Sequence, residues 1–256
     1  MSRRVEAADR PPPLLKPVLI FFQVVLAALA VGWIALAGST IFQPSFRQVA
    51  DRLVRGETYD TGGLRRLISP EAGQGGGLCD LKRRRSALLI QLRVATNSFQ
   101  NADLHAVDND VMDVSTRARE LLQCSPTDGF AWLAMYWAEI YRAGFGPGAV
   151  SYLTQSYRFA PHEGWIQLFR APLALRSGNL LSESLRQAAL ADFDDIFRSR
   201  LYASAALIYK SSAADLRTAL LDRTCDSPAE PRAVLLHFLK EQGLSIRHRC
   251  YPDADQ

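Results

Sequence analysis

The sequence has no charged residue from Pro17 to Phe46, although charged residues make up 22% of the 256-residue chain. Within this stretch, Val18 to Ala37 are twenty consecutive residues in which Gln23 is the only strongly polar side chain. A helix of that length spans about 30 Å, the thickness of the hydrocarbon core of a bilayer. The lack of a polar face argues against a helix on the surface of a globular domain. We therefore expect residues 17–42 to form a transmembrane helix, with residues 18–37 in the lipid bilayer.

A cleavable signal peptide is the alternative, because Ala35-Leu36-Ala37 before Gly38 fits the small-residue pattern of a cleavage site. The apolar stretch is longer than the ~7–15 residues usual in such peptides, which favours a retained signal anchor. Positive residues resist translocation, and residues 1–16 carry four of them against two acidic residues. The sequence thus predicts a cytoplasmic basic leader at 1–16, a single pass through the inner (plasma) membrane, and a periplasmic or extracellular C-terminal domain.

The chain contains only four cysteines, and no two of them form a Cys-x-x-Cys pair. That absence excludes zinc-ribbon and thioredoxin-type motifs. An even number of widely separated cysteines is typical of an oxidising compartment, in agreement with an extracytoplasmic domain. Three pairings are open. We favour structural disulfides Cys79–Cys124 and Cys225–Cys250, because each pair flanks its own helical stretch, and four buried free thiols are the alternative.

The usual signatures of catalysis and of metal or cofactor binding are missing as well. The four histidines occur without His-Glu-x-x-His or other paired ligand spacing, and there is no Gly-x-Ser-x-Gly nucleophile motif. The formal net charge is only +4, and half of it lies in residues 1–16, which argues against a nucleic-acid surface. We expect no catalytic residue, metal, cofactor or nucleic-acid partner. An enzyme whose site is invisible in the sequence stays as an alternative.

From residue 79 onward the apolar residues recur with helical spacing and strand-like alternation is absent, so we expect an all-α domain over residues 79–256. A short amphipathic helix at 46–54 and a Gly-rich linker are expected before it, within residues 43–78. Near the C-terminus, Ser227 predicts a helix N-cap and Gly243 a helix end. Solvated helix faces are expected for the basic run at 82–85, where a phosphate site is the alternative, and for the acidic residues Asp192, Asp194 and Asp195.

Two segments of the helical region share a pattern. Each begins with a proline three residues before a glycine, at Pro126 and at Pro161, and each has a tryptophan a few residues later. The prolines are 35 residues apart, and Trp132 and Trp165 are 33 residues apart. Each segment has the length of a helix pair, and a period of about 34 residues is typical of helical repeats.

With these features the chain resembles the tetratricopeptide (TPR) repeat family over one repeat length. Trp132 and Met135 stand at the Trp and Leu positions of the family's first helix. Two features depart from the family, since Tyr136 replaces a small residue and the turn at 144–148 is one residue longer. The family's second helix is matched at four positions, Ala149, Leu153, Ser156 and Pro161. The resemblance implies stacked helix pairs with a concave binding surface, and an irregular helical bundle is the alternative.

The resemblance also implies which side chains have which role. Trp132 is expected in the core. With Gly129 as the first repeat position, the groove-facing binding residues are Phe130, Leu133, Trp137, Ile140 and Tyr141, with packing against the next repeat as their alternative role. The leading hypothesis is an extracytoplasmic scaffold or adaptor that binds a partner protein of the cell envelope, similar to the anchored TPR-like proteins that accompany bacterial surface-polysaccharide assembly. Direct binding of a glycan or lipid-linked sugar is the second hypothesis.

Overall fold

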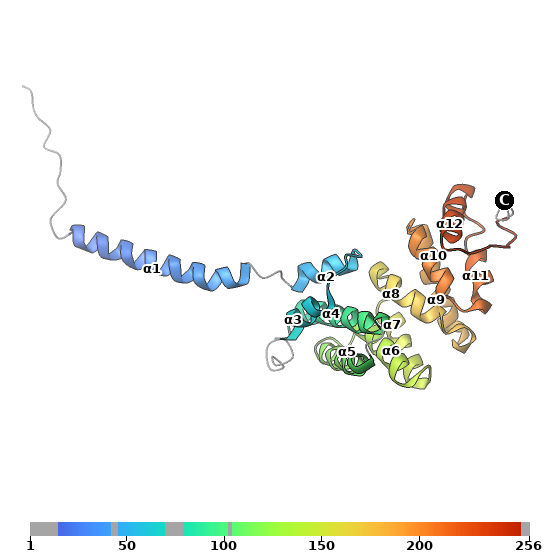
Figure 1. The fold of residues 1–256 in the computed structure, drawn as a ribbon, viewed down its shortest axis with the longest axis horizontal. Coiled ribbons are helices and arrows are strands. Elements are labelled where there is room, and N and C mark those ends of the chain that lie inside the picture. The colour runs from blue at the N-terminus through green and yellow to red at the C-terminus, as the bar shows by residue number, and fades with distance from the viewer. Residues whose placement is uncertain (1–14, 42–45, 70–78, 102–103, 252–256) are drawn as a thin grey trace, which may run out of the picture. The chain divides into compact units, whose positions relative to one another are not determined.

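A computed structural model of the chain describes residues 15–41, 46–69, 79–101 and 104–251. Their regular structure is entirely helical, with no strand in the described ranges, which confirms the predicted all-α class (Figure 1). The chain divides into two compact units, Met1–Ser45 and Phe46–Gln256. The basic leader before Leu15 and the glycines at 75–77 lie outside the described residues.

The first unit contains one helix, α1 (Leu15–Ile41), close to the bounds expected from the sequence. The side chains described in it are those of Pro17 and residues 20–33, and all of them are exposed. Among the residues that the structure describes, no helix combines the length and the apolar character needed to cross a bilayer. The transmembrane role of this segment therefore stays a prediction.

The second unit is built mainly of helix pairs (Figure 1). In three successive pairs, α4 packs on α5, α6 on α7, and α8 on α9. Their bounds are Leu81–Gln100, Leu104–Cys124, Gly129–Ala143, Pro147–Phe159, Gly164–Leu175 and Glu183–Arg198. The first helices of the pairs also touch one another, since α6 contacts both α4 and α8. This arrangement is repeat-like, with α4, α6 and α8 forming one continuous face.

Shorter helices close the two ends of the array. At the N-terminal end, α2 (Phe46–Val54) and α3 (Thr61–Ile68) both pack on α4. At the C-terminal end, α10 (Tyr202–Ser211) packs on α8, α9 and α12 (Ala229–Glu241), and α11 (Arg217–Asp222) packs on α9. The predicted helix at 46–54 is confirmed with the same bounds, and its apolar face is buried through Val49, Ala50 and Leu53.

The helix α3 lies where a flexible linker was expected. Asp60 caps it, because its Oδ2 accepts a hydrogen bond from the Gly63 backbone N–H at 2.7 Å. Leu64 and Ile68 are buried, and the guanidinium of Arg65 lies 2.6 Å from the Asp110 carboxylate of α5. Two glycines lower the intrinsic helix propensity of this segment, but the cap and the tertiary contacts outweigh that cost.

The starts of α9 and α12 are capped in different ways. Ser182 caps α9 by accepting a hydrogen bond from the Leu185 N–H, and the helix continues to Arg198. Pro228, rather than Ser227, is the N-cap of α12, and no side-chain hydrogen bond caps that helix start. The predicted end of this helix is confirmed, since Gly243 has a φ of +74°, a conformation that glycine adopts at little cost.

Both predicted disulfides are present, and no free cysteine is found among the described residues. Cys79–Cys124 joins the position two residues before α4 to the last residue of α5, and Cys225–Cys250 joins the turn after α11 to the C-terminal segment. The two links close loops with sequence separations of 45 and 25 residues. Restricting the unfolded chain in this way contributes about 3–4 kcal/mol per disulfide in the chain-entropy model.

The start of α6 lies very close to the end of α7. A Cβ atom added to Gly129 would overlap the Cβ of Ala160, and it would lie 3.2 Å from the Ala160 backbone nitrogen. The equivalent glycine of the next pair, Gly164, has more space, because its nearest neighbour would be the Gln167 Oε1 atom at 3.9 Å. The absence of a side chain at Gly129 therefore sets how closely α6 and α7 approach each other.

We predict that Gly129→Ala destabilises the full-length protein by about 1–3 kcal/mol, because the added methyl group overpacks a backbone contact that cannot relax cheaply. Gly164→Ala is the matched control and should leave stability unchanged or slightly raised, because alanine is the better helix former. Chemical denaturation followed by circular dichroism measures both. Equal stability of the two variants would contradict the close contact at Gly129.

Arg170 is a fully buried arginine at the centre of the second unit. Its guanidinium donates two hydrogen bonds to the buried Asp192 carboxylate, Nε to Oδ2 at 2.8 Å and Nη2 to Oδ1 at 2.9 Å. Nη1 donates to the carbonyl oxygens of Ser156 and Ala160, at 3.1 and 2.9 Å. The ion pair thus ties the end of α7 to α8 and α9. The expectation that Asp192 is solvated is wrong, because its side chain faces the core.

We predict that Asp192→Ala costs about 3–5 kcal/mol of unfolding free energy, because it leaves the Arg170 charge buried without a counterion. Asp194→Ala is the control two residues away. Asp194 pairs with Arg198 on the surface of the same helix, so its removal should cost only a small fraction of that amount. The denaturant concentrations at the unfolding midpoints of the two variants test this prediction. Similar losses of stability would show that the buried ion pair contributes no more than the surface pair.

Candidate functional site

The continuous face of α4, α6 and α8 contains a pocket of about 410 Å³, which we call the aromatic pocket. A volume of this size is typical of sites that bury a small molecule or a few side chains of a partner. The helix α2 contributes Leu53 at one edge. The remaining lining residues are Leu89, Leu92, Arg93, Thr96, Phe99, Gln100, Leu133, Trp137, Tyr141, Leu168, Phe169, Pro172, Leu173 and Arg176.

Three aromatic rings from α4 and α6 are packed together in this pocket. The Phe99 and Tyr141 ring centroids are 4.1 Å apart, and those of Trp137 and Tyr141 are 4.5 Å apart. Phe99 meets Trp137 edge to face at 6.0 Å. Trp137 is only 4% exposed, whereas Tyr141 is 41% exposed. Trp137 therefore forms the buried floor of the cluster and Tyr141 its accessible ring, an arrangement suited to contact with an apolar ligand surface.

Two arginines give the aromatic pocket a positive character. Arg93 of α4 is half-buried and Arg176, directly after α8, is exposed, and no aspartate or glutamate lines the pocket. Neither guanidinium forms an ion pair with any of the described residues. Arginine binds carboxylate and phosphate groups through two parallel hydrogen bonds. The site thus combines an apolar base with two cations that are available to an anionic group.

The structure brings together only part of the set predicted to face the groove. Leu133, Trp137 and Tyr141 line the aromatic pocket. Phe130 does not, because it is fully buried against Trp165, with the ring centroids 4.9 Å apart. Ile140 is half-buried and packs on the core without lining the pocket. The residues contributed by α4 and α8 were missed because the repeat register was assigned only to α6 and α7.

Trp132 lies nearer the surface than the expected core position. It faces the second helix of its pair, as the motif implies, and its ring stacks on that of Tyr152 in α7 at 6.0 Å. It is not a core residue, since it is only half-buried and its Nε1 donates a hydrogen bond to the Pro126 carbonyl oxygen at 2.8 Å. Trp132 therefore stabilises the turn before α6 from the surface.

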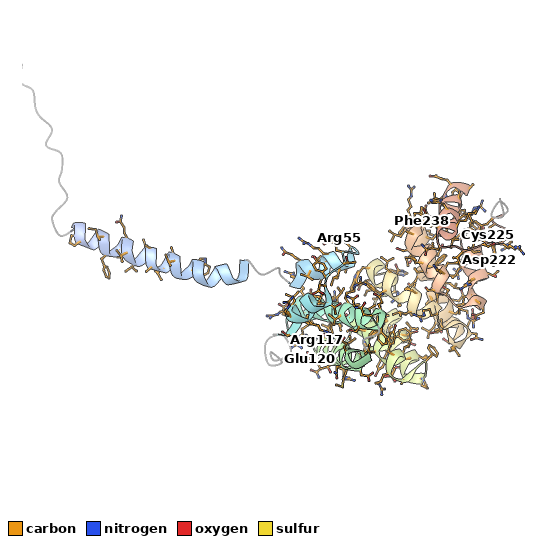
Figure 2. The ribbon with its side chains drawn as sticks, viewed as in Figure 1. Arg55, Arg117, Glu120, Asp222, Cys225 and Phe238 are labelled. Carbon is orange, nitrogen blue, oxygen red and sulfur yellow. A yellow bond between two sulfur atoms is a disulfide. The ribbon has the colours of Figure 1, made fainter. Side chains whose placement is uncertain are left out.

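The basic run at 82–85 lies mostly on an exposed helix face, as expected, since Lys82, Arg83 and Arg85 are exposed and Arg84 is half-buried. Two of these residues also make structural contacts. Arg85 lies 2.6 Å from the fully buried carboxylate of Asp128, whose other oxygen caps α6 by accepting the Ala131 N–H at 2.9 Å. Arg84 donates a hydrogen bond to the backbone carbonyl of Glu120 on α5 (Figure 2 labels Glu120). Arg85 thus joins the first two helix pairs, and Arg84 joins the two helices of the first pair, which weakens the case for a phosphate site here.

Comparisons of the chain with protein-family models, curated proteins and solved structures find no match. Its function is therefore argued from the residues of its own fold. Among the sites predicted from the sequence, the aromatic pocket is the one for which the structure provides an accessible apolar surface and free charged groups together.

Proposed function

We propose that the protein is a membrane-anchored scaffold or adaptor whose helical-repeat domain holds a partner protein on the outer side of the membrane. The observation that carries this proposal is the aromatic pocket, an accessible apolar site bordered by two arginines that form no ion pair with any described residue. A partner segment that fits it is a short helix with an apolar face and at least one acidic side chain. Such a helix would place its apolar residues on Tyr141 and its carboxylates near Arg93 and Arg176.

The position of α2 supports a helical occupant. This helix already lies on α4 with Val49, Ala50 and Leu53 turned inward, and Leu53 reaches the edge of the aromatic pocket. The face of α4 therefore accepts an amphipathic helix at one end, and the aromatic pocket continues the same face toward α6 and α8. A second helix seated there would use the same kind of contact, in which apolar residues spaced by three or four enter a groove.

The anchor and the location rest on other features. The twenty uncharged residues from Val18 to Ala37 suit a membrane helix, and the basic leader suits its cytoplasmic end. The two disulfides suit an oxidising compartment. We also infer that the helix pairs are TPR-like, supported by the side-by-side first helices and the tight contact at Gly129. By the same resemblance, the partner belongs to the cell envelope, in surface-polysaccharide assembly.

We predict that the double variant Arg93→Glu/Arg176→Glu stays folded and no longer retains the partner, because acidic residues would repel the carboxylates that the arginines attract. Affinity purification of the full-length chain from solubilised membranes measures retention, with the partner identified by mass spectrometry and its binding segment remade as a peptide. A Tyr141→Ala variant should weaken peptide binding by about tenfold or more, as expected of a central aromatic contact.

The matched control for this experiment reverses two other exposed arginines, Arg119 of α5 and Arg158 of α7, which lie outside the aromatic pocket. The Arg119→Glu/Arg158→Glu double variant should retain the partner. Equal retention by both double variants would place the interaction elsewhere. The second hypothesis would be favoured if the protein bound a glycan or lipid-linked sugar in place of the peptide, and if Arg93→Glu/Arg176→Glu lost this binding while Arg119→Glu/Arg158→Glu kept it.

We predict a cytoplasmic N-terminus and an exported second unit. Alkaline phosphatase fused after Gln256 should be active, because that enzyme matures only outside the cytoplasm, whereas green fluorescent protein fused at the same place and exported through the general secretory route should not fluoresce. The reverse pair of results would overturn the topology, and with it the compartment assigned to the partner.

A further inference from the structure

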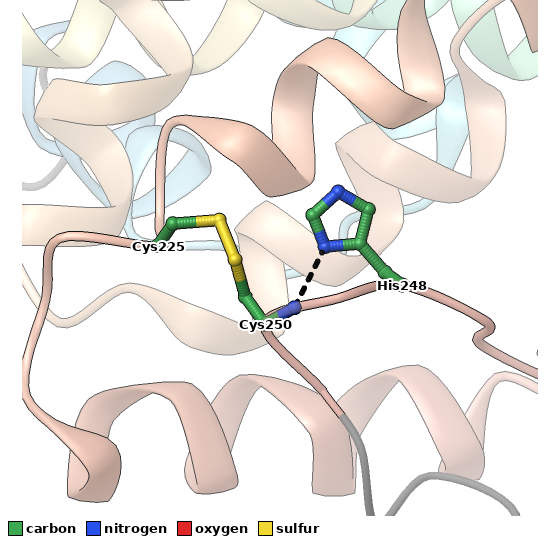
Figure 3. A group of neighbouring side chains, drawn as sticks. All are labelled: Cys225, His248 and Cys250. Carbon is green, nitrogen blue, oxygen red and sulfur yellow. Dashed lines mark hydrogen bonds between the residues drawn. A yellow bond between two sulfur atoms is a disulfide. The ribbon is translucent and has the colours of Figure 1, made fainter.

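The Cys225–Cys250 disulfide lies beside a histidine in the C-terminal part of the fold (Figure 3). Cys225 follows α11, while His248 and Cys250 belong to the segment after α12. A ring nitrogen of His248 and the two sulfur atoms lie within 4.8 Å of one another. In the part of the chain that the structure describes, this is the one group of three or more Cys, His, Asp or Glu side chains close enough to share a metal ion.

Asp222 lies next to this group and contacts its histidine. Its Oδ1 lies 3.3 Å from His248 Nε2 and 4.0 Å from Cys225 Sγ (Figure 2 labels Asp222 and Cys225). The Nδ1 atom of His248 accepts a hydrogen bond from the Cys250 N–H at 3.3 Å, so the ring proton is on Nε2, which faces the Asp222 carboxylate. Nδ1 is therefore the ring nitrogen with a lone pair for a metal ion, and Asp222 holds the other ring nitrogen from behind, as carboxylates do with histidine ligands.

We propose that reduction of this disulfide converts the group into a zinc site with Cys225, Cys250 and His248 as ligands and a water molecule at the fourth position. In the oxidised protein the two sulfurs are bonded to each other and bind no metal. A dithiol reductant transfers two electrons and two protons to the disulfide, which yields two thiols, while the reductant becomes a disulfide. The two thiols then lose their protons to solvent as the thiolates bind Zn²⁺. Two sulfur ligands with one nitrogen and one oxygen suit a tetrahedral zinc ion.

The surroundings fit the charge of such a site. Two thiolates balance the charge of Zn²⁺. The Asp222 carboxylate behind His248 is paired with Arg249, whose guanidinium lies 2.7 Å from Asp222 Oδ1. The carboxylate that orients the histidine is thus itself held by a hydrogen-bonding partner. The C-terminal segment is thus fastened to α11 by a disulfide in one redox state and by a metal in the other.

The other disulfide provides an internal control. Cys79 and Cys124 border a pocket that contains Arg84, Thr116, Arg119, Glu120 and Gln123, and no histidine. Neither of these cysteines belongs to a group of three candidate ligands among the described residues. Reduction of the whole protein therefore produces four thiols, of which only Cys225 and Cys250 face a histidine and a carboxylate.

The test is a titration of the full-length protein with Co²⁺, which replaces zinc and gives intense visible bands in a tetrahedral site with thiolate ligands. The reduced protein, freed of reductant under anaerobic conditions, should bind one Co²⁺ per chain and lose the colour when Zn²⁺ is added. The oxidised protein should stay colourless. The reduced Cys79→Ser/Cys124→Ser variant should behave like the native chain, and His248→Ala should weaken binding by at least the ~10–100-fold typical of an altered metal shell.

Three results would overturn the proposal. They are a colourless reduced protein, the loss of colour in Cys79→Ser/Cys124→Ser, and unchanged Co²⁺ affinity in His248→Ala. Circular dichroism of the same samples covers the case in which reduction unfolds the C-terminal helices. If reduction unfolds these helices, the proposal requires that Zn²⁺ restores the helical signal of the native chain but not that of the Cys225→Ser/Cys250→Ser variant. A reduced native chain that does not recover its helical signal with Zn²⁺ would also overturn the proposal.

Discussion

The buried ion pair between Arg170 and Asp192 is the constraint on which the repeat-like domain depends. A guanidinium is taken fully out of water, and the loss of its hydration is tolerable only because each of its nitrogens is hydrogen-bonded. Burial raises the pKa of Asp192 above its usual value, and the hydrogen bonds and charge of Arg170 act in the opposite direction. Arg170 lies on α8 and its partners come from the end of α7 and from α9, so these three helices have one mutual arrangement that satisfies the charge.

That arrangement positions one wall of the aromatic pocket. Arg170 lies on the buried side of α8, while Phe169, Pro172 and Leu173 of the same helix line the pocket. Tyr136, the residue that departs from the TPR pattern, reinforces the link between α6 and α8. It is fully buried, and its hydroxyl lies 3.2 Å from Ser177 Oγ beyond the end of α8. A larger side chain at this position thus connects neighbouring pairs where the family has a small residue.

The sequence predicted the features that have local causes. Helical periodicity and the glycine at the end of α12 depend on residues close together in the chain. The cysteine pairing, with separations of 45 and 25 residues, was predictable for another reason, because four cysteines allow only three pairings. The burial of Asp192 could not be predicted in this way, because its partner Arg170 is 22 residues distant and an acidic run normally indicates a solvated face. The same limit applies to the aromatic pocket, where the register of one pair identified Trp137 and Tyr141 but not Phe99 on α4. The cluster of Cys225, His248 and Asp222 does not match a known metal-binding motif, because α12 separates Asp222 and Cys225 from His248 in the sequence.

The distribution of constraints along the domain bears on what the aromatic pocket can do. One disulfide fixes the α4–α5 pair, and the Arg170–Asp192 ion pair fixes α8 against its neighbours, so the α4 and α8 walls of the pocket are both held. Its accessible components are side chains rather than mobile backbone, because Tyr141 and Arg176 extend from helices that are otherwise packed. A site of this kind offers a preformed surface and loses little conformational entropy on binding, and affinity then depends on how well the partner's apolar and acidic groups match it.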